Sequence, residues 1–236
     1  MSDTLPIAET FISIQGEGKR TGLPSFFIRL SGCNLRCGWC DTPHASWNPE
    51  RTPRTIESLV NEARDAGVTE VVITGGEPMM FPGVTILSNA LAKAGFRNTI
   101  ETAGTVYASV ACSLMSISPK LANSTPVEGD PRDPGGVWRL RHEERRINVP
   151  VLQRLLDEHP DRQLKFVVSN PAEFGEIQSL LAALSGVRPE DVLIMPEGIA
   201  SPPPGATVWI VKEAIARGWR YCHRLHLDLF GHRRGT

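Results

Sequence analysis

Apolar residues recur along this chain in two alternating patterns. Short runs rich in β-branched and aromatic residues, closed by glycine, proline or serine, predict strands. Between them, apolar residues three and four positions apart predict amphipathic helices. The predicted strands cover residues 5–14, 26–30, 70–74, 97–102, 113–118, 163–169, 191–195 and 221–227. The predicted helices cover residues 84–94, 171–184 and 207–216, with two more that begin after caps at Thr55 and Asn148.

This alternation predicts an α/β fold built from parallel βαβ units, with helices on the outer face of the sheet. The units are too few for a closed barrel of eight strands, so we expect a partial, splayed TIM-like barrel of the (βα)6 type. A length of 236 residues fits one domain, residues 1–236. Prolines and glycines interrupt residues 123–136, and we expect an insertion or a mobile lid over residues 123–146.

Polar motifs follow several predicted strands at the point where each strand ends. They occupy residues 33–40, 74–78, 102, 118–120 and 195–198. Because the carboxyl ends of parallel strands meet at one edge of a sheet, where α/β proteins bind ligands, we expect these motifs to line a single large pocket.

Composition narrows the class of protein. The formal charge of −1 and the 22% of charged residues give no basic surface for nucleic acid or membranes. No run of about 20 apolar residues predicts a membrane span, and the N-terminus has no secretory pattern. Five cysteines, three of them clustered, do not form a disulfide framework. We expect a cytoplasmic protein with free thiols.

The clustered cysteines are Cys33, Cys37 and Cys40, in a loop that follows an apolar run. Three thiolates hold a metal centre but leave it one ligand short. An iron–sulfur cluster normally takes four cysteines, so one iron would keep an open position for a small molecule. A zinc site that recruits His44, or three unpaired structural thiols, are the alternatives.

Three other motifs have both a structural and a functional interpretation. Residues 15–18 form a hairpin loop or approach a ligand closely through glycine. Residues 75–78, Gly-Gly-Glu-Pro, form a turn or bind a methionine amino or carboxylate group through the backbone. Ser118 and Lys120 are solvated or bind a ribose or carboxylate.

The spacing C-x3-C-x2-C after a strand, followed by Gly-Gly-Glu-Pro one βα unit later, resembles the radical S-adenosylmethionine (SAM) superfamily. Further motifs are the Ile-Gln-Gly-Glu-Gly run at residues 14–18, Asp41-Thr42, and Ser-Pro-Lys at residues 118–120. With these, the chain resembles the 7-carboxy-7-deazaguanine synthase family from about Leu5 to Thr236. Residues 123–146 match this family least.

The resemblance implies a homodimer with a reduced partial barrel that binds a 4Fe–4S cluster, SAM and Mg2+. It implies conversion of 6-carboxy-5,6,7,8-tetrahydropterin to 7-carboxy-7-deazaguanine, with release of ammonia, for queuosine- or archaeosine-type pathways. A 5′-deoxyadenosyl radical would abstract hydrogen from C6 of the pterin, so no side chain is expected to be a general acid or base. A flavodoxin or ferredoxin would supply the electron.

The resemblance also implies roles for individual residues. Cys33, Cys37 and Cys40 would hold the cluster, and Thr42 would bind Mg2+. The SAM contacts would be Trp39, Cys40, Asp41, Gly76, Ser118, Pro119, Lys120, Met195, Pro196, Glu197 and Gly198. The pterin contacts would be Ile14, Gln15, Gly16, Arg29, Thr74 and Thr236.

Two other functions fit parts of the sequence. A glycyl-radical-enzyme activase has a similar size and cysteine spacing but acts on a protein loop. A non-catalytic zinc or iron–sulfur interaction module needs only the cysteines. Cys112 and Cys222 are interpreted as core thiols, and His226, within the last predicted strand, as a packing or substrate-contacting residue.

Overall fold

The computed structural model describes residues 3–236. The strands are β1 (Thr4–Ile14), β2 (Pro24–Leu30), β3 (Thr52–Thr55), β4 (Glu70–Gly75), β5 (Arg97–Thr102), β6 (Leu114–Ile117), β7 (Arg162–Val168), β8 (Val192–Pro196) and β9 (Arg220–Tyr221). The α-helices are α1 (Ile56–Asp65), α2 (Gly83–Lys93), α3 (Val137–Arg145), α4 (Val149–Glu158), α5 (Glu173–Ala182), α6 (Val208–Arg217) and α7 (Leu225–Phe230).

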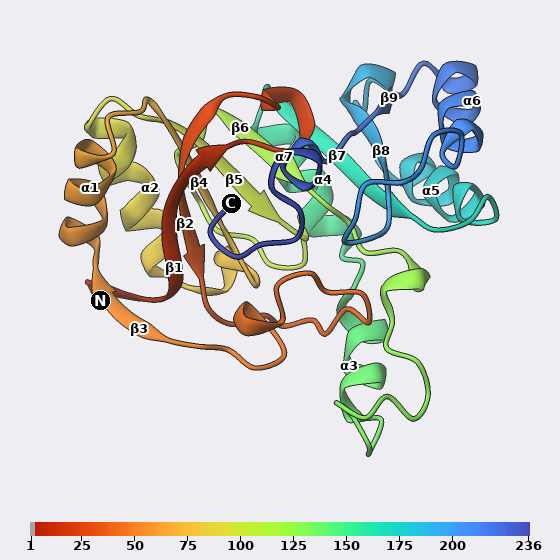
Figure 1. The fold of residues 1–236 in the computed structure, drawn as a ribbon, viewed down its shortest axis with the longest axis horizontal. Coiled ribbons are helices and arrows are strands. Elements are labelled where there is room, and N and C mark those ends of the chain that lie inside the picture. Colours follow the sequence, from red (N-terminus) through yellow and green to blue (C-terminus); the bar gives the residue numbers. More distant parts are fainter. Residues whose placement is uncertain (1–2) are drawn as a thin grey trace.

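The strands form one sheet in the order β3-β1-β2-β4-β5-β6-β7-β8-β9 (Figure 1). Every neighbouring pair from β2 to β9 is parallel, whereas β1 runs antiparallel to both β2 and β3. The predicted α/β architecture is therefore confirmed. Within residues 3–236, no helix has the length and apolar character needed to cross a membrane.

Local sequence signals explain where several helices begin and end. The Thr55 hydroxyl accepts a hydrogen bond from the Ser58 backbone N–H at the start of α1, and Asn148 caps α4 in the same way through Val151. Gly218 ends α6 with a φ of 67°, a conformation that glycine adopts without strain. The two predicted caps are confirmed.

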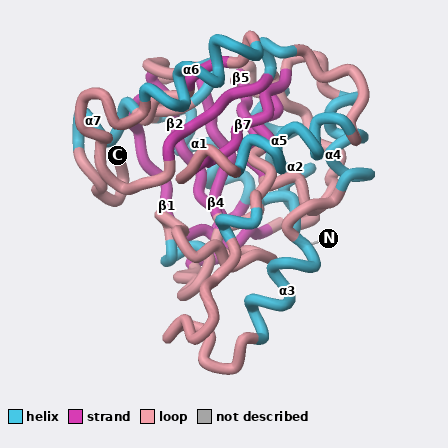
Figure 2. The backbone as a smooth tube through the Cα atoms, turned by 90° about the vertical axis from the view of Figure 1, so that its right-hand side faces the viewer, coloured by secondary structure: helices cyan, strands magenta, loops and turns pink. Residues whose placement is uncertain are grey.

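Side chains alternate across the parallel strands between two environments. In β7, Leu164 and Phe166 belong to the buried core, whereas Lys165 and Val167 line a cavity on the opposite face. In the other strands the core receives Ile28, Ile73, Ile100 and Ile117, and the cavity receives Arg29, Thr74, Glu101 and Ser116. Figure 2 shows α4 and α5 on one side of the molecule and α7 with the C-terminus on the other.

The predicted strand over residues 221–227 is wrong. Strand β9 ends at Tyr221, and His226 lies on α7 instead. The chain leaves the sheet because the Leu225 backbone N–H donates to the Gly16 carbonyl oxygen, at 2.9 Å, and thereby turns toward the β1–β2 hairpin. The alternation of apolar and polar residues here is real, but long-range contacts override it.

The segment between the cysteines and α1, for which the sequence predicts no strand, ends in β3. This short strand pairs with the start of β1, where Pro53 lies opposite Pro6. Proline lacks a backbone N–H, so it is tolerated at a sheet edge, which β3 forms.

Residues 123–146, here called the lobe, include α3 and extend away from the sheet (Figure 1). The lobe packs on residues 33–40, here called the cysteine loop. The Gly38 N–H donates to the Ser124 carbonyl oxygen at 2.7 Å, and the Arg36 N–H donates to His142 Nδ1 at 3.1 Å. The description of this segment as an insertion or lid stays a prediction, but its contacts fasten it to the loop.

His142 gives this contact a predicted pH dependence. The side chain is fully buried, and its burial lowers the pKa to about 4; Glu143 raises that pKa, while Arg146 and Lys120 lower it. A histidine in an unfolded chain has a pKa of about 6.5, so between these values only the unfolded chain takes up this proton. We expect the free energy of unfolding to fall as the pH drops from about 6.5 toward 4.

The variant His142→Asn keeps a hydrogen-bond acceptor but does not titrate. Urea unfolding at several pH values should show a lower stability at pH 7 by about 1–3 kcal/mol and a flatter dependence in the acid window. If the unfolding free energies of the wild type and the variant fall equally as the pH drops from about 6.5 toward 4, this account of His142 is wrong.

Candidate active site

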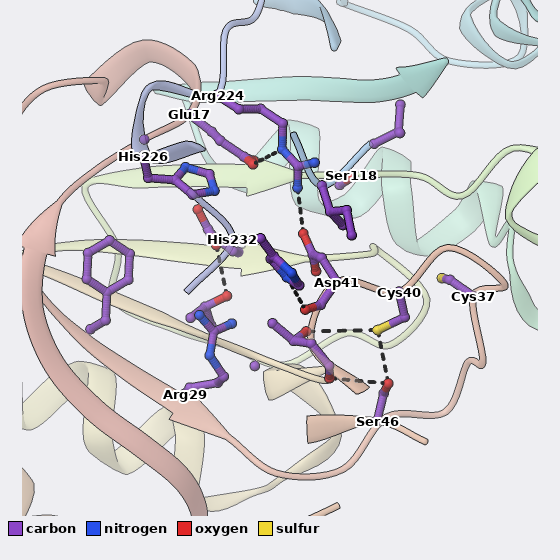
Figure 3. Close-up of a pocket in the computed structure, with 18 of the residues that line it drawn as sticks. Glu17, Arg29, Cys37, Cys40, Asp41, Ser46, Ser118, Arg224, His226 and His232 are labelled. Atoms are coloured by element: carbon purple, nitrogen blue, oxygen red, sulfur yellow. Dashed lines mark hydrogen bonds and ion pairs between the residues drawn. The ribbon is translucent and has the colours of Figure 1, made fainter. Parts of the chain in front are cut away.

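A cavity of about 410 Å³ lies at the carboxyl ends of the parallel strands and beneath residues 224–236, here called the C-terminal segment. Every residue that we expect to contact the cluster, SAM, Mg2+ or the pterin lines this cavity, except Pro119 and Pro196. The predicted convergence of strand-end motifs on one pocket is therefore present in the fold. Figure 3 shows Cys37, Cys40 and Ser118 among the side chains around this cavity.

The cysteine loop contributes three sulfur atoms to the cavity wall. Cys33, Cys37 and Cys40 all line the cavity, and the Cys40 sulfur lies 3.0 Å from the Ser46 hydroxyl. Burial raises the pKa of Cys33 to about 12, and it also raises the pKa of Cys37. Both groups are protonated thiols without a bound metal, so metal binding must release their protons.

The Gly-Gly-Glu-Pro motif joins the end of β4 to the cysteine loop. A Cβ on Gly76 would lie 2.2 Å from the Gly32 carbonyl oxygen and 2.6 Å from that of Ala45. Glu77 donates its N–H to Gly32 O, and its carboxylate accepts hydrogen bonds from Thr102 and Ala103. Glycine is thus required here by close backbone packing, while Gly76 still lines the cavity.

Several residues expected to contact SAM surround the cysteine side of the cavity. Lys120 donates to the Ser118 hydroxyl at 2.9 Å, and its ammonium lies 5.5 Å from the centre of the Trp39 ring. The Trp39 indole N–H is buried and has no hydrogen-bond partner among residues 3–236. A buried unpaired donor is costly, and this one belongs to a side chain that lines the cavity. Met195, Glu197 and Gly198 line the same cavity.

Residues expected to contact the pterin surround a carboxylate that the sequence analysis left without a role. Glu101 accepts hydrogen bonds from the Gln15 amide at 3.1 Å and from the Thr74 hydroxyl at 2.8 Å. Arg29 donates through Nε to Glu9 at 2.7 Å, and its guanidinium lies 5.7 Å from the centre of the Phe11 ring. Burial would raise the pKa of Glu9, but Arg29, Arg234 and His44 together hold it below its ordinary value.

A buried ionic network crosses the cavity from the β1–β2 hairpin to the cysteine loop. Glu17 pairs with Lys165 and, at 3.0 Å, with Arg224; Arg224 also reaches Asp41 at 2.5 Å (Figure 3). Burial would raise the pKa of Glu17, but Lys165 and Arg224 hold it well below its ordinary value. Burial would lower the pKa of Lys165, but Glu17 and Glu101 hold it above its ordinary value. Glu17, Lys165 and Arg224 therefore keep their charges near neutral pH.

The C-terminal segment closes over the cavity through contacts of its own. A Cβ on Gly16 would lie 2.0 Å from His226 Nδ1, so only glycine lets α7 approach the hairpin. Arg234 donates to Glu9 at 3.0 Å, and His232 contacts the Asp41 carbonyl oxygen at 3.1 Å. Thr236 also lines the cavity.

Sequence reasoning missed several charged residues of this site. They are Glu9, Glu17, Glu101, Lys165, Arg224, His232, Arg233 and Arg234. A signal existed for two of them: Glu101 and Lys165 are charged residues inside strands of a parallel sheet, and the residues on either side of each are uncharged. Such strands are normally covered on both faces, so a lone charge there indicates a cavity. The residues of the C-terminal segment gave no comparable signal.

Comparison with known proteins identifies the family. Residues 27–122 match the radical SAM superfamily. Over 234 residues, the chain is 45% identical to the 7-carboxy-7-deazaguanine synthase of Rhodopirellula baltica, covering 99% of this chain and 89% of that protein. This chain belongs to the 7-carboxy-7-deazaguanine synthase family. The family member from Halobacterium salinarum is 43% identical, over 96% of this chain and 90% of its own length.

A solved structure supports the same family. The crystal structure of QueE from Escherichia coli superimposes with a TM-score of 0.69 at 27% identity and covers 94% of this chain and 95% of its own. The expected radical SAM partial barrel is thereby confirmed. Membership in this enzyme family argues against both an activase and a non-catalytic interaction module.

The residues present fit the cofactors that radical SAM proteins use. Three thiols from one loop line a cavity whose wall also includes Trp39 and Lys120. Thiolates are the ligands of iron–sulfur clusters. Among residues 3–236, no group of three or more His, Cys, Asp or Glu side chains is arranged to hold a single metal ion, so the fit rests on three thiols that line one cavity and not on a preformed ion site.

Gly76→Ala tests the packing of the cysteine loop. The new methyl group would overlap the Gly32 and Ala45 carbonyl oxygens, so we expect a loss of about 1–3 kcal/mol in unfolding free energy and a lower iron content after anaerobic reconstitution. Gly175→Ala is the control, because a Cβ there meets nothing within 4 Å and alanine favours the helix. Equal effects of the two variants would contradict the packing account.

Lys165→Met tests the ionic network, because it leaves Glu17 buried with one partner fewer. We expect a loss of about 3–5 kcal/mol in urea unfolding, part of which Glu17→Gln restores in the double variant. Glu158→Gln, which removes an exposed pair with Arg154, should change stability by less than about 1 kcal/mol. Additive effects of Lys165→Met and Glu17→Gln would show that the two charges are not coupled.

Proposed function

We propose that this protein is a radical SAM enzyme that converts 6-carboxy-5,6,7,8-tetrahydropterin to 7-carboxy-7-deazaguanine with release of ammonia. The product would enter 7-deazapurine biosynthesis of the queuosine or archaeosine type. The observation that carries the proposal is the 45% identity, over nearly the whole chain, to a protein named for this reaction. A single cavity that combines three cysteines with a polar, partly charged wall supports it.

Cys33, Cys37 and Cys40 would hold the 4Fe–4S cluster, and Trp39 and Lys120, which both line the cavity, would face SAM. When bound, the cluster and SAM would supply radical chemistry to the substrate. The protein orients the reactants and excludes water from them. The C-terminal segment contributes to that exclusion because Arg224, His232 and Arg234 fasten it over the cavity.

The pterin would bind beside Glu101. The aminopyrimidinone edge of a pterin carries N–H donors, and a carboxylate with two free lone-pair directions accepts such a pair. Gln15 and Thr74 already orient Glu101 by hydrogen bonds, which fixes the carboxylate before substrate arrives. Arg29 has the fork geometry that recognises a carboxylate, so it is our choice for the substrate carboxyl group.

Mg2+, an electron donor and a second subunit complete the proposal. Mg2+ prefers oxygen ligands and keeps several waters; Thr42, which lines the cavity and whose hydroxyl lies 3.9 Å from the Cys40 sulfur, would supply one such oxygen. A flavodoxin or ferredoxin would reduce the cluster, and we infer a cytoplasmic homodimer. The chain would act as one domain with the lobe as an insertion.

An anaerobic turnover assay tests the function. Reconstituted protein with SAM, a reductant, Mg2+ and 6-carboxytetrahydropterin should form 7-carboxy-7-deazaguanine, detected by mass spectrometry. Cys40→Ala should abolish product, whereas Cys112→Ala, a cysteine outside the cavity wall, should not. Cleavage of SAM to 5′-deoxyadenosine without this product would overturn the substrate and leave the cluster assignment intact.

Thr42→Val tests the Mg2+ role, because it removes an oxygen ligand at nearly constant shape. We expect product formation at a fixed Mg2+ concentration to fall on the order of tenfold or more and to recover partly at higher Mg2+. Thr21→Val, in the exposed β1–β2 loop, is the matched control. A Mg2+ dependence unchanged from the wild type would exclude Thr42 as a ligand.

A further inference from the structure

The cysteine loop contains a buried positive charge that no step above uses. Arg36 lies between Leu35 and Cys37 and is only 9% exposed. It is absent from the cavity wall, so it does not touch what the cavity binds. Its guanidinium donates to the carbonyl oxygens of Cys33 and Leu35, each at 2.7 Å. The loop is therefore folded around this side chain.

The lobe covers the other side of Arg36. The guanidinium carbon lies 3.9 Å from the centre of the Trp138 ring, a stacked cation–π contact. The backbone N–H of Arg36 donates a hydrogen bond to one ring nitrogen of His142. The other ring nitrogen of His142 contacts the Ser124 hydroxyl at 2.8 Å. Arginine tolerates such burial because its guanidinium is weakly hydrated and stays protonated. The result is a permanent positive charge in a fixed position.

This charge lies inside the loop that carries all three cysteines and is hydrogen-bonded to the Cys33 carbonyl oxygen. Burial and the nearby Arg51 lower the pKa of Arg36, whereas Cys33, Cys40 and Cys37 raise it when they are thiolates, as they would be around a cluster. Other charges act on the same sulfurs: Lys120 lowers the pKa of Cys37, and Glu77 raises that of Cys33. The Lys120 ammonium comes from outside the loop and faces the cavity. Arg36, in contrast, is the basic residue within residues 33–40 themselves.

A 4Fe–4S core held by three thiolates is anionic, and reduction adds a further negative charge. The potential of such a cluster depends on nearby charge, hydrogen bonds and solvent exposure. We propose that Arg36 is a positioning residue of the cysteine loop whose fixed charge stabilises the reduced cluster and so raises its reduction potential. The lobe, through Trp138 and His142, keeps that charge dry and in place. This inference rests on the cluster of the proposed function.

The test is a redox titration of the reconstituted protein, followed by electron paramagnetic resonance of the reduced cluster. At the wild-type midpoint, Arg36→Met should lower the ratio of reduced to oxidised cluster on the order of tenfold, which is about 59 mV for a one-electron couple. Arg36→Lys keeps the charge and should stay within about twofold of the wild type.

Arg154→Met is the matched control. Arg154 also stacks on an aromatic ring, 3.4 Å from the centre of Tyr107, but it is exposed and lies outside the cavity wall. This variant should leave the midpoint unchanged. An unchanged midpoint in Arg36→Met, or equal shifts in Arg36→Met and Arg36→Lys, would overturn the proposal.

If Arg36→Met assembles no cluster, Trp138→Leu decides the question. Loss of the ring exposes the guanidinium to water, which screens its charge, so the midpoint should shift in the same direction by a smaller amount. A wild-type midpoint in Trp138→Leu would then mean that Arg36 only folds the loop. A wild type that holds a cluster but makes no 7-carboxy-7-deazaguanine would refute the substrate and not this inference.

Discussion

The site depends on the alternation of side chains along a parallel sheet. Each strand sends one set of residues into the helix-covered core and the next set into the cavity, so Phe166 packs while Lys165 faces the site. Because the strands are parallel and in register, their cavity-facing residues and their terminal loops gather at one edge. The fold thereby positions the cysteine loop, Glu101 and Lys120 around a common space without any dedicated binding domain.

Charge then fixes the parts of the chain that the sheet does not hold. Glu17 on the hairpin is compensated by Lys165 from β7 and Arg224 from the C-terminal segment, and Arg224 continues to Asp41 beside the last cysteine. A buried carboxylate with one partner removed is strongly destabilising, so these segments are interdependent. The Arg224 guanidinium therefore joins the C-terminal segment, which covers the cavity, to Asp41 next to the cysteine loop.

Much of this arrangement is readable in the sequence because its signals are local. The strand before the cysteines, the caps at Thr55 and Asn148, and the strand-end motifs all follow from periodicity and composition. The course of residues 221–227 does not, since Arg224 pairs with Glu17, 207 positions away. Gly76 was expected for ligand approach, but its requirement comes from the Gly32 and Ala45 carbonyls, a contact that no local pattern encodes.

The central claim is that one cavity, built from the inner face of the strands and closed by the C-terminal segment, holds both SAM and the pterin. An anaerobic crystal structure with cluster, SAM and 6-carboxytetrahydropterin tests it most directly. The account predicts SAM beside Trp39 and Lys120, and the pterin in the same cavity with its amino edge on Glu101. A pterin bound outside this cavity, or SAM bound away from the three cysteines, would contradict it.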